Sequence, residues 1–358
     1  MKENILDQKD KIFKNDPDNM LSCIEDLPDQ IRDTWEQAKE MIIPAHYINI
    51  ENIVIAGMGG SAIGPDSIVN FAKESLKKPI EIVRDYDLPH YVGKKTLVII
   101  SSYSGTTEET LSAFEQALAV DAKIIGIAHQ GTVEEICKSH NLPFFKLEYD
   151  SQPRAASPSS AIAIAGMLNK LGLVKITDEE IEQTYRETKE LQTNLNINIP
   201  TSENQAKILA TKIHAYIPFV IASGSLLKAA HKFKISFNEN SKHLAFFEAI
   251  PELNHNTMTG LEFPNGLSDK IFIIILQSIY DHPRNKLRSR IILNLLNKRR
   301  IKFDTIMFPQ SSCKLAEMFK MIELGDYVSY YLAMLNGIDP TPVKAVDYFK
   351  NELNKENK

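Results

Sequence analysis

A β-branched apolar run that stops at a glycine-rich turn constrains the fold of this chain more than any other feature. Residues 53–56 read Ile-Val-Ile-Ala, the turn Gly-Met-Gly-Gly-Ser follows at 57–61, and a helical pattern is expected over 64–76. A strand, a tight turn and a helix in this order point backbone N–H groups at an anion. The dinucleotide spacing G-x-G-x-x-G is matched only by Gly57, Gly59 and Ala62. The segment therefore indicates either an anion site or a turn that merely needs small residues.

A second strand-to-helix junction is crowded with hydroxyl groups. The apolar run 96–100 leads into Ser-Ser-Tyr-Ser-Gly-Thr-Thr at 101–107, and an amphipathic helix is expected over 107–119. Hydroxyls and uncapped amides bind phosphate without the full desolvation cost of a cation. A helix cap needs one or two such residues, and this segment has five besides Tyr103. The two junctions together predict a phosphate cradle formed by Gly60, Ser61, Ser102, Ser104 and Thr107.

Apolar bursts and helical patterns alternate through the first half of the chain. Further strands are expected at 80–83, 123–127 and 143–147, and further helices near 28–42, 131–139 and 159–171. Such alternation predicts an α/β fold, with a doubly wound, mostly parallel sheet of the flavodoxin-like kind. Ligands of such sheets lie at the carboxyl ends of the strands, where both polar junctions fall.

The second half repeats this rhythm after a polar, helix-prone stretch near 177–200. Residues 218–225 read Pro-Phe-Val-Ile-Ala-Ser-Gly-Ser, strands are expected at 271–276 and 303–308, and a helix over 286–298. The repetition predicts an internal duplication whose second copy lost the hydroxyl-rich segment. We expect two domains, residues 1–178 with the phosphate cradle and residues 179–358 with further chemistry.

Composition and charge exclude several classes of protein. The 358 residues carry a net charge of −5, which disfavours nucleic acid as a partner. The three cysteines lack metal-ligand spacing, so we expect no metal and no disulfide framework. The N-terminus is polar, and the longest aliphatic burst, 271–276, is too short to span a membrane. These features predict a cytoplasmic enzyme without a metal or cofactor.

Several motifs together resemble one family. Gly-Met-Gly-Gly-Ser-Ala at 57–62 and the hydroxyl-rich segment from 101 are typical of sugar isomerase (SIS) domains. Asn-Glu-Asn-Ser-Lys at 238–242, Asn-His-Asn at 254–256 and Pro-Thr-Pro at 340–342 extend the match over most of the chain. The chain thus resembles the bifunctional phosphoglucose/phosphomannose isomerases, which carry two SIS domains in tandem. Thr106, where that family usually has Asn, is a departure that leaves the neighbouring hydroxyls in place.

The resemblance implies an aldose–ketose isomerase that needs no metal. It would interconvert glucose 6-phosphate, and mannose 6-phosphate, with fructose 6-phosphate through an enediol. This chemistry needs a base that moves a proton between C2 and C1, a group that opens the ring, and a cation beside the enediolate oxygen. The resemblance also implies a homodimer.

Four residues are the candidates for this chemistry. Glu239 is the expected base, and Asn238 and Asn240 beside it could orient it without adding charge. Arg154 follows the last strand of the first domain and suits a fixed electrostatic catalyst, because a guanidinium stays protonated. The resemblance further implies a lysine from the terminal helix near the sugar; Lys350 is the first choice and Lys344 the second.

The fourth candidate is His255, which we expect on a loop. Its neighbours Asn254 and Asn256 have amides that could fix the tautomer of its ring. The resemblance gives His255 the role of ring-opening acid/base and implies that it reaches into the partner subunit's active site.

Two other classes of function compete with the isomerase. A non-catalytic SIS sensor of sugar phosphates would keep the cradle but would need neither Glu239 nor His255, and no DNA-binding or kinase-partner segment is visible. A glucosamine 6-phosphate synthase-type enzyme would need an ammonia source, and the chain has no N-terminal nucleophile cysteine. The isomerase is the favoured interpretation.

Overall fold

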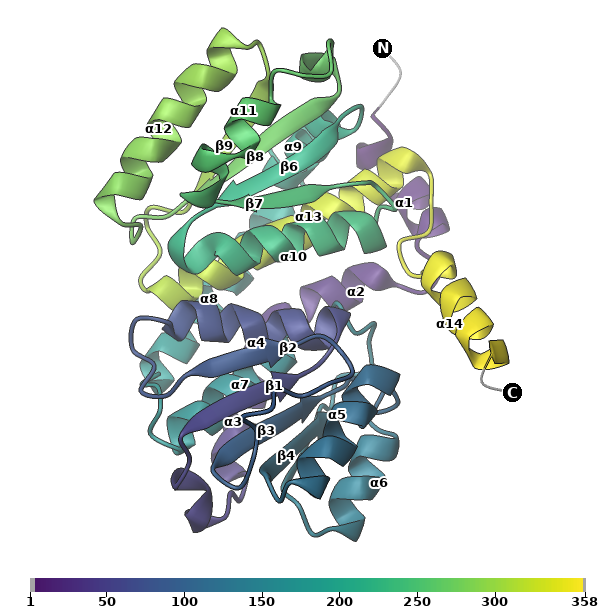
Figure 1. The fold of residues 1–358 in the computed structure, drawn as a ribbon. Coiled ribbons are helices and arrows are strands. Elements are labelled where there is room, and N and C mark those ends of the chain that lie inside the picture. The colour runs from purple at the N-terminus through teal and green to yellow at the C-terminus, as the bar shows by residue number, and fades with distance from the viewer. Residues whose placement is uncertain (1–3, 357–358) are drawn as a thin grey trace.

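Two parallel sheets form the framework of the protein, as a computed structural model covering residues 4–356 shows (Figure 1). The first sheet has the strand order β2-β1-β3-β4-β5, and the second has the order β7-β6-β8-β9. The strands are β1 Asn52–Ala56, β2 Ile80–Val83, β3 Thr96–Ser101, β4 Lys123–Ala128, β5 Phe144–Lys146, β6 Ile217–Ala222, β7 Phe246–Ala249, β8 Ile271–Gln277 and β9 Lys302–Met307. The predicted α/β fold is confirmed.

The strands at the centre of each sheet are apolar runs because helices cover both faces. All six residues of β3 are buried, as are four of the five residues of β1. The two strands pair in parallel, with Ile53 opposite Leu97 and Ile55 opposite Ile99. Strands buried on both faces do not alternate apolar and polar residues as half-exposed strands do. They therefore appear in the sequence as continuous apolar runs.

The helices of the first half lie near the expected ranges. They are α3 Leu27–Glu40, α4 Gly59–Ala72, α5 Glu108–Ala119, α6 Thr132–Ser139 and α7 Ser157–Lys170. The start of α4 differs, because the helix begins at Gly59 and not at residue 64. The glycine-rich residues therefore form its first turn, and Gly59 has a φ of +50°, a backbone conformation that suits glycine.

The second half is built from α8 Asp178–Leu195, α9 Gln205–Ile213, α10 Leu227–Glu239, α12 Pro283–Lys298, α13 Lys314–Asn336 and α14 Lys344–Glu356. Shorter helical pieces are η1 Ile5–Asp7, α1 Lys9–Asn15, α2 Met20–Glu25, η2 Ala45–Ile48, η3 Gly224–Leu226, η4 Glu252–His255, α11 Thr257–Gly260 and η5 Leu267–Asp269.

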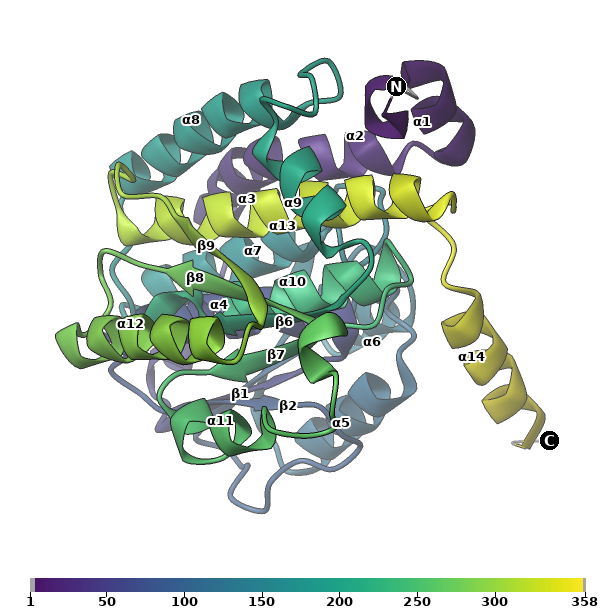
Figure 2. The same ribbon diagram turned by 90° about the horizontal axis from the view of Figure 1, so that it is seen from above.

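Helices α4 and α10 lie between the two sheets, and α13 runs through the interior alongside α8, α9 and α10 (Figures 1 and 2). Almost every residue of α13 from Leu315 to Met334 is buried, including the charged residues Glu317, Glu323 and Asp326, because other helices surround it. Asp66 of α4 pairs with Lys228 of α10, with 2.8 Å between Oδ2 and Nζ. The two halves thus share one large core.

The terminal helix α14 differs from the rest. Both views show it standing away from the two sheets (Figures 1 and 2). Its apolar side chains Val346, Tyr348 and Phe349 are exposed.

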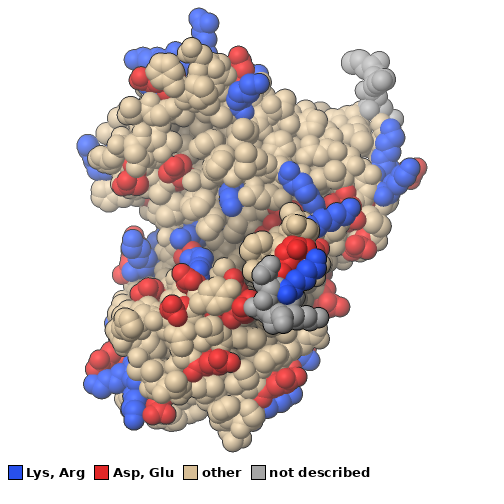
Figure 3. Space-filling view, turned by 45° about the vertical axis from the view of Figure 1, so that its right-hand side comes forward, with Lys and Arg blue, Asp and Glu red and all other residues tan. Residues whose placement is uncertain are grey.

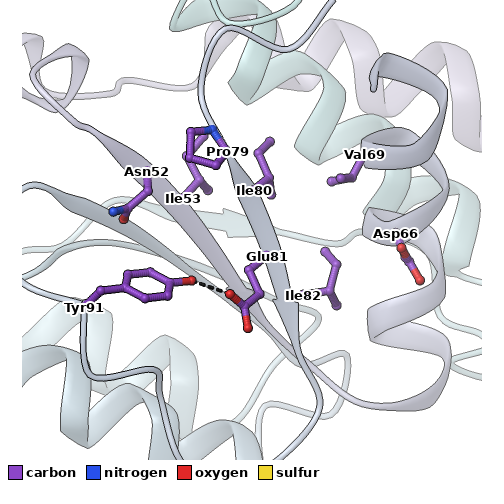
Figure 4. A pocket seen from close by; sticks show the side chains of 9 residues that line it. All are labelled: Asn52, Ile53, Asp66, Val69, Pro79, Ile80, Glu81, Ile82 and Tyr91. Atoms are coloured by element: carbon purple, nitrogen blue, oxygen red, sulfur yellow. Dashed lines mark hydrogen bonds between the residues drawn. The ribbon is translucent and has the colours of Figure 1, made fainter. Parts of the chain in front are cut away.

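Two hollows mark the surface. The space-filling view shows a waist between the upper and lower lobes (Figure 3). A separate open groove runs beside the edge strand β2, where Tyr91 donates a hydrogen bond to Glu81 (Figure 4). Its other lining residues are Asn52, Ile53, Asp66, Val69, Pro79, Ile80 and Ile82, none of which belongs to the predicted cradle.

Candidate active site

The two polar junctions of the first domain meet, as their strand order requires. Because β1 and β3 are adjacent and parallel, their carboxyl ends lie side by side. The Ser101 hydroxyl donates to the Ser61 carbonyl at 2.8 Å, and the Tyr103 amide donates to Ser61 Oγ at 2.9 Å. A side chain at Gly57 would place its Cβ only 2.7 Å from the Ser101 carbonyl oxygen, so glycine is needed for this approach.

The hydroxyls at the start of α5 face one another rather than capping the helix. Ser102 Oγ lies 2.9 Å from Thr107 Oγ1, and Ser102 is buried. Thr107 is the N-cap residue of α5, yet its side chain makes no capping hydrogen bond. Ser104 is exposed, and its hydroxyl accepts from the Thr106 amide at 3.3 Å. A helix start with uncapped amides and paired hydroxyls is suited to an anion.

Gly60 joins this cradle to the loop that carries Arg154. A Cβ at Gly60 would lie 2.5 Å from the Pro153 carbonyl oxygen and 2.8 Å from the Arg154 amide nitrogen. No larger residue fits at this position without moving the backbone. The first turn of α4 therefore packs directly on the residues that position the guanidinium.

The Arg154 side chain is only 2% exposed and spans the two halves of the chain. Its Nε donates to Asn240 Oδ1 at 2.5 Å, and its Nη2 donates to the carbonyls of Pro340 and Thr341 at 2.8 and 2.9 Å. Its Nη1 is buried and has no hydrogen-bond partner among the described residues. Burial lowers the pKa of Arg154, and Glu239 opposes that shift.

Glu239 is the last residue of α10 and lies beside this guanidinium. Its Oε2 is 3.7 Å from Arg154 Nη1, and its side chain is 33% exposed. The expectation that the flanking amides orient Glu239 is wrong. Asn238 accepts from the Ala245 amide, and Asn240 binds Arg154 and the Ser329 hydroxyl.

Two residues without a predicted role also lie here. Lys242 Nζ donates to the carbonyls of Asp339 and Pro340, at 2.9 and 2.8 Å. Thr341 is buried, and its Oγ1 has no hydrogen-bond partner among the described residues. Both belong to sequence motifs noted above, but only the tertiary structure places these motifs against Arg154.

His255 follows the carboxyl end of β7, whereas Glu239 precedes the amino end of that strand. Its ring is exposed, and it ends η4, a short helix and not the expected loop. The expectation that its neighbours fix its tautomer is also wrong: the Asn254 amide group contacts Met258 and Arg288, and that of Asn256 contacts Glu252 and Thr257.

The two candidate lysines of the terminal helix differ in their relation to the site. Lys350 is exposed on α14, and no hydrogen bond or ion pair joins it to Arg154 or Glu239 in the described part of the chain. Lys344, the first residue of α14, lies close enough to Lys242 to contribute to the lowering of its pKa.

Among residues 4–356, no group of three or more His, Cys, Asp or Glu side chains is arranged to hold a metal ion. Within the same residues, every helix is too short or too polar to cross a bilayer.

Comparisons with known proteins identify the family of the chain. Residues 202–353 match the family model of the bacterial phospho-glucose isomerase C-terminal SIS domain. The bifunctional phosphoglucose/phosphomannose isomerase of Caldicellulosiruptor bescii is 38% identical over 335 residues, which cover 93% of this chain and 98% of that protein. The protein of the same name from Aquifex aeolicus is 34% identical, over 90% of this chain and 94% of its own length.

Solved structures show the same fold at lower identity. A hypothetical protein from Thermus thermophilus superposes with a TM-score of 0.76 at 16% identity, over 98% of this chain and 93% of its own. A glucose-6-phosphate isomerase from Chlamydia trachomatis gives a TM-score of 0.68 at 15% identity, over 92% of this chain and 72% of its own. On the strength of its sequence relatives, the chain belongs to the family of bifunctional phosphoglucose/phosphomannose isomerases.

Proposed function

We propose that this protein interconverts glucose 6-phosphate, and mannose 6-phosphate, with fructose 6-phosphate. The names of its relatives carry these two activities. One observation carries the proposal for this chain: Gly60 packs the phosphate cradle directly against the loop of Arg154, whose free Nη1 lies beside Glu239. A sensor would need the cradle but not this carboxylate and cation.

In the proposed reaction, Glu239 moves the proton between C2 and C1 of the open-chain sugar. Its partly exposed carboxylate is open to a ligand. Arg154 Nη1 is a donor without a partner among the described residues, aimed at the region where the enediolate oxygen develops charge. The other guanidinium nitrogens are held by Asn240 and two carbonyls, so the group is organised before substrate arrives.

The phosphate binds where the two helix starts converge. Gly60 and Ser61 supply the first turn of α4, and Ser102, Ser104 and Thr107 supply hydroxyls before α5. Anions at helix N-termini are stabilised by backbone N–H groups and the helix dipole. Holding the phosphate there gives the reacting carbons a fixed position relative to Arg154 and Glu239.

His255 acts in the site of a second subunit, in a homodimer. Because α10 crosses back from β6 to the parallel strand β7, its last residue, Glu239, lies at the amino end of these strands. The contact of His243 Nε2 with the carbonyl of Tyr216, just before β6, agrees with this position.

His255 instead follows the carboxyl end of β7, where the Ile250 amide donates to the Ala222 carbonyl at the end of β6. The four residues of β7 alone span about 13 Å. His255 is thus far from Glu239 of its own chain, which supports a site completed by a partner. The lysine near the sugar comes from α14, as Lys350 or Lys344.

A coupled assay tests the proposed function. Fructose 6-phosphate is supplied, and formation of glucose 6-phosphate is followed through a dehydrogenase, with and without EDTA. We expect turnover in both conditions, because the proposed acid/base set needs no metal. No formation of glucose 6-phosphate would overturn the proposal, and loss of activity with EDTA would overturn its metal-independent form. Such an activity belongs to glycolysis and gluconeogenesis in the cytoplasm, and we assign the protein to both.

A further inference from the structure

Lys242 is a cation beside the site that the proposed reaction does not use, and its ammonium is held by hydrogen bonds although the residue is exposed. It follows the end of α10 with a φ of +50°, a conformation uncommon for a residue with a side chain. Its ammonium donates to three backbone carbonyls, those of Asn240 at 3.3 Å, Asp339 at 2.9 Å and Pro340 at 2.8 Å. All three acceptors lie beside Arg154, so the lysine occupies a position defined by the site.

Arg154 and Lys242 share one acceptor. The Pro340 carbonyl accepts from Arg154 Nη2 at 2.8 Å and from Lys242 Nζ at 2.8 Å. Two cations on one oxygen repel each other, and the consecutive carbonyls of Asp339, Pro340 and Thr341 supply the partial negative charge that offsets this repulsion. The segment 339–341 and the two cations therefore form one interlocked unit.

We propose that Lys242 is a positioning residue for the isomerase site: its ammonium holds segment 339–341 in place, and that segment holds the Arg154 guanidinium beside Glu239. Arg154 has only two other tethers among the described residues, Asn240 and the Thr341 carbonyl. Without Lys242, the segment loses the donors that hold Asp339 and Pro340 to the end of α10. The guanidinium then keeps its charge but loses its fixed position.

The charge state of Lys242 matters to this role. An ammonium has three donors for three carbonyls, whereas the neutral amine has two and turns a lone pair toward the third. Burial and the charges of Arg154 and Lys344 lower the pKa of Lys242 to about 8, against the opposing effects of Asp339 and Glu239. The unit therefore loosens as pH rises through this range, and isomerase activity falls with it.

Lys207 offers a matched control that makes no contact with the proposed site residues among the described interactions. Its Nζ likewise donates to backbone carbonyls, those of Ile197 and Ile199, and pairs with Asp7, although Lys207 is fully buried whereas Lys242 is exposed. Lys207→Met removes an ammonium that is also held by backbone carbonyls, at a position with no described contact to segment 339–341. A purely structural role for Lys242 would make the two lysines equivalent in kinetics.

The experiment measures kcat and KM from pH 6.5 to 9.5 for the wild type, Lys242→Met, Lys242→Arg and Lys207→Met, with folding checked by circular dichroism. This inference rests on the proposed function, which the wild-type assay alone decides. We expect Lys242→Met to lower kcat by about 10- to 100-fold, because small misplacements of catalytic groups have effects of this size. We expect the activity of the wild type to fall above about pH 8, which gives its pH profile an alkaline limb. Both Lys242 variants should lack this alkaline limb.

Lys242→Arg, which keeps a cation at every pH tested, should recover part of the lost kcat. Lys207→Met should keep the wild-type kcat and alkaline limb even if its melting temperature falls. A kcat of Lys242→Met within about two-fold of the wild type would overturn the proposal. So would an unchanged alkaline limb in Lys242→Arg, the variant that decides the question if Lys242→Met does not fold.

Discussion

Arg154 Nη1 lies 3.7 Å from Glu239 Oε2, close enough for charge attraction but too far for a hydrogen bond. The nitrogen is buried and has no other partner among the described residues, whereas the carboxylate is partly exposed. A buried donor without an acceptor is unfavourable unless something else binds it. A sugar oxygen placed between the two groups would satisfy the guanidinium and lie next to the base.

Replacing Glu239 by Gln should remove turnover and leave ligand binding nearly intact. The amide keeps the shape of the side chain but cannot accept the proton, and general-base losses are on the order of 10²- to 10⁴-fold. The rate is measured with the coupled assay, and affinity by calorimetry with a competitive sugar-phosphate inhibitor. Glu203→Gln, at an exposed position outside the site, serves as the control. Near-normal turnover in Glu239→Gln would remove this residue from the base role.

Arg154→Lys should be severely impaired although it keeps the charge. A lysine has a single nitrogen and cannot replace the Nε and Nη2 contacts with Asn240, Pro340 and Thr341 while also presenting a donor at the Nη1 position. We expect kcat to fall by about 10²- to 10³-fold, as for the loss of one preorganised donor. An Arg154→Lys protein with normal kcat would show that a guanidinium held at several nitrogens is not needed for turnover.

The double substitution Ser61→Ala and Ser102→Ala should raise KM with a smaller effect on kcat. Each lost hydrogen bond to a charged acceptor is worth about 1.5–3 kcal/mol, so the pair should raise KM about 10²-fold or more. Ser112→Ala, on the same helix as the cradle but away from its start, is the control. A double variant with the same KM as the wild type would contradict the assignment of these residues to a phosphate cradle.

Mixing two inactive proteins should restore activity if His255 serves the partner's site. Glu239→Gln and His255→Ala subunits in one dimer give one intact site and one doubly altered site. At random exchange about half of the dimers are mixed, so about a quarter of wild-type sites should reappear. Subunit exchange is followed with differently tagged chains. No recovery despite proven exchange would assign His255 to its own subunit, and a fully active monomer in sedimentation would reject the dimer.

His231 should make the protein less stable as pH falls. Burial, and the nearby cations Lys228 and Arg84, lower its pKa to about 4, whereas an unfolded histidine titrates near 6.5. The unfolded state therefore binds the extra proton between these values, so the contribution of His231 to stability is complete above about pH 6.5 and is lost toward pH 4.

His231→Phe keeps the ring that stacks on Phe247 at 4.2 Å between centroids. The variant should lose less free energy of unfolding than the wild type between pH 7.5 and pH 5, as measured by urea titration at the two values. Equal losses in the two proteins would rule out His231 as the titrating group.

The sequence by itself determined the elements of the fold, and it also predicted the phosphate cradle. Buried parallel strands such as β1 and β3 are continuous apolar runs and are recognisable in the sequence. Because adjacent parallel strands end at the same edge of a sheet, the proximity of Ser61 and Ser102 could be predicted. Arg154 and Glu239 were each predicted as site residues, but their contact was not, since no local pattern links residues so far apart in the chain. The boundary at 178/179 and the role of Lys350 stay predictions.

Tertiary structure alone decided what surrounds the guanidinium. Asn240 binds Arg154 and not Glu239, and Lys242 shares the Pro340 carbonyl with Arg154. Neither contact leaves a sequence pattern, because the partners lie far apart in the chain and because the Pro340 acceptor is a backbone carbonyl, a group that every residue has. The same holds for His255, whose position at the carboxyl end of β7 follows from the crossover of α10. Local patterns show which elements form, and only the packing of distant segments shows which atoms meet.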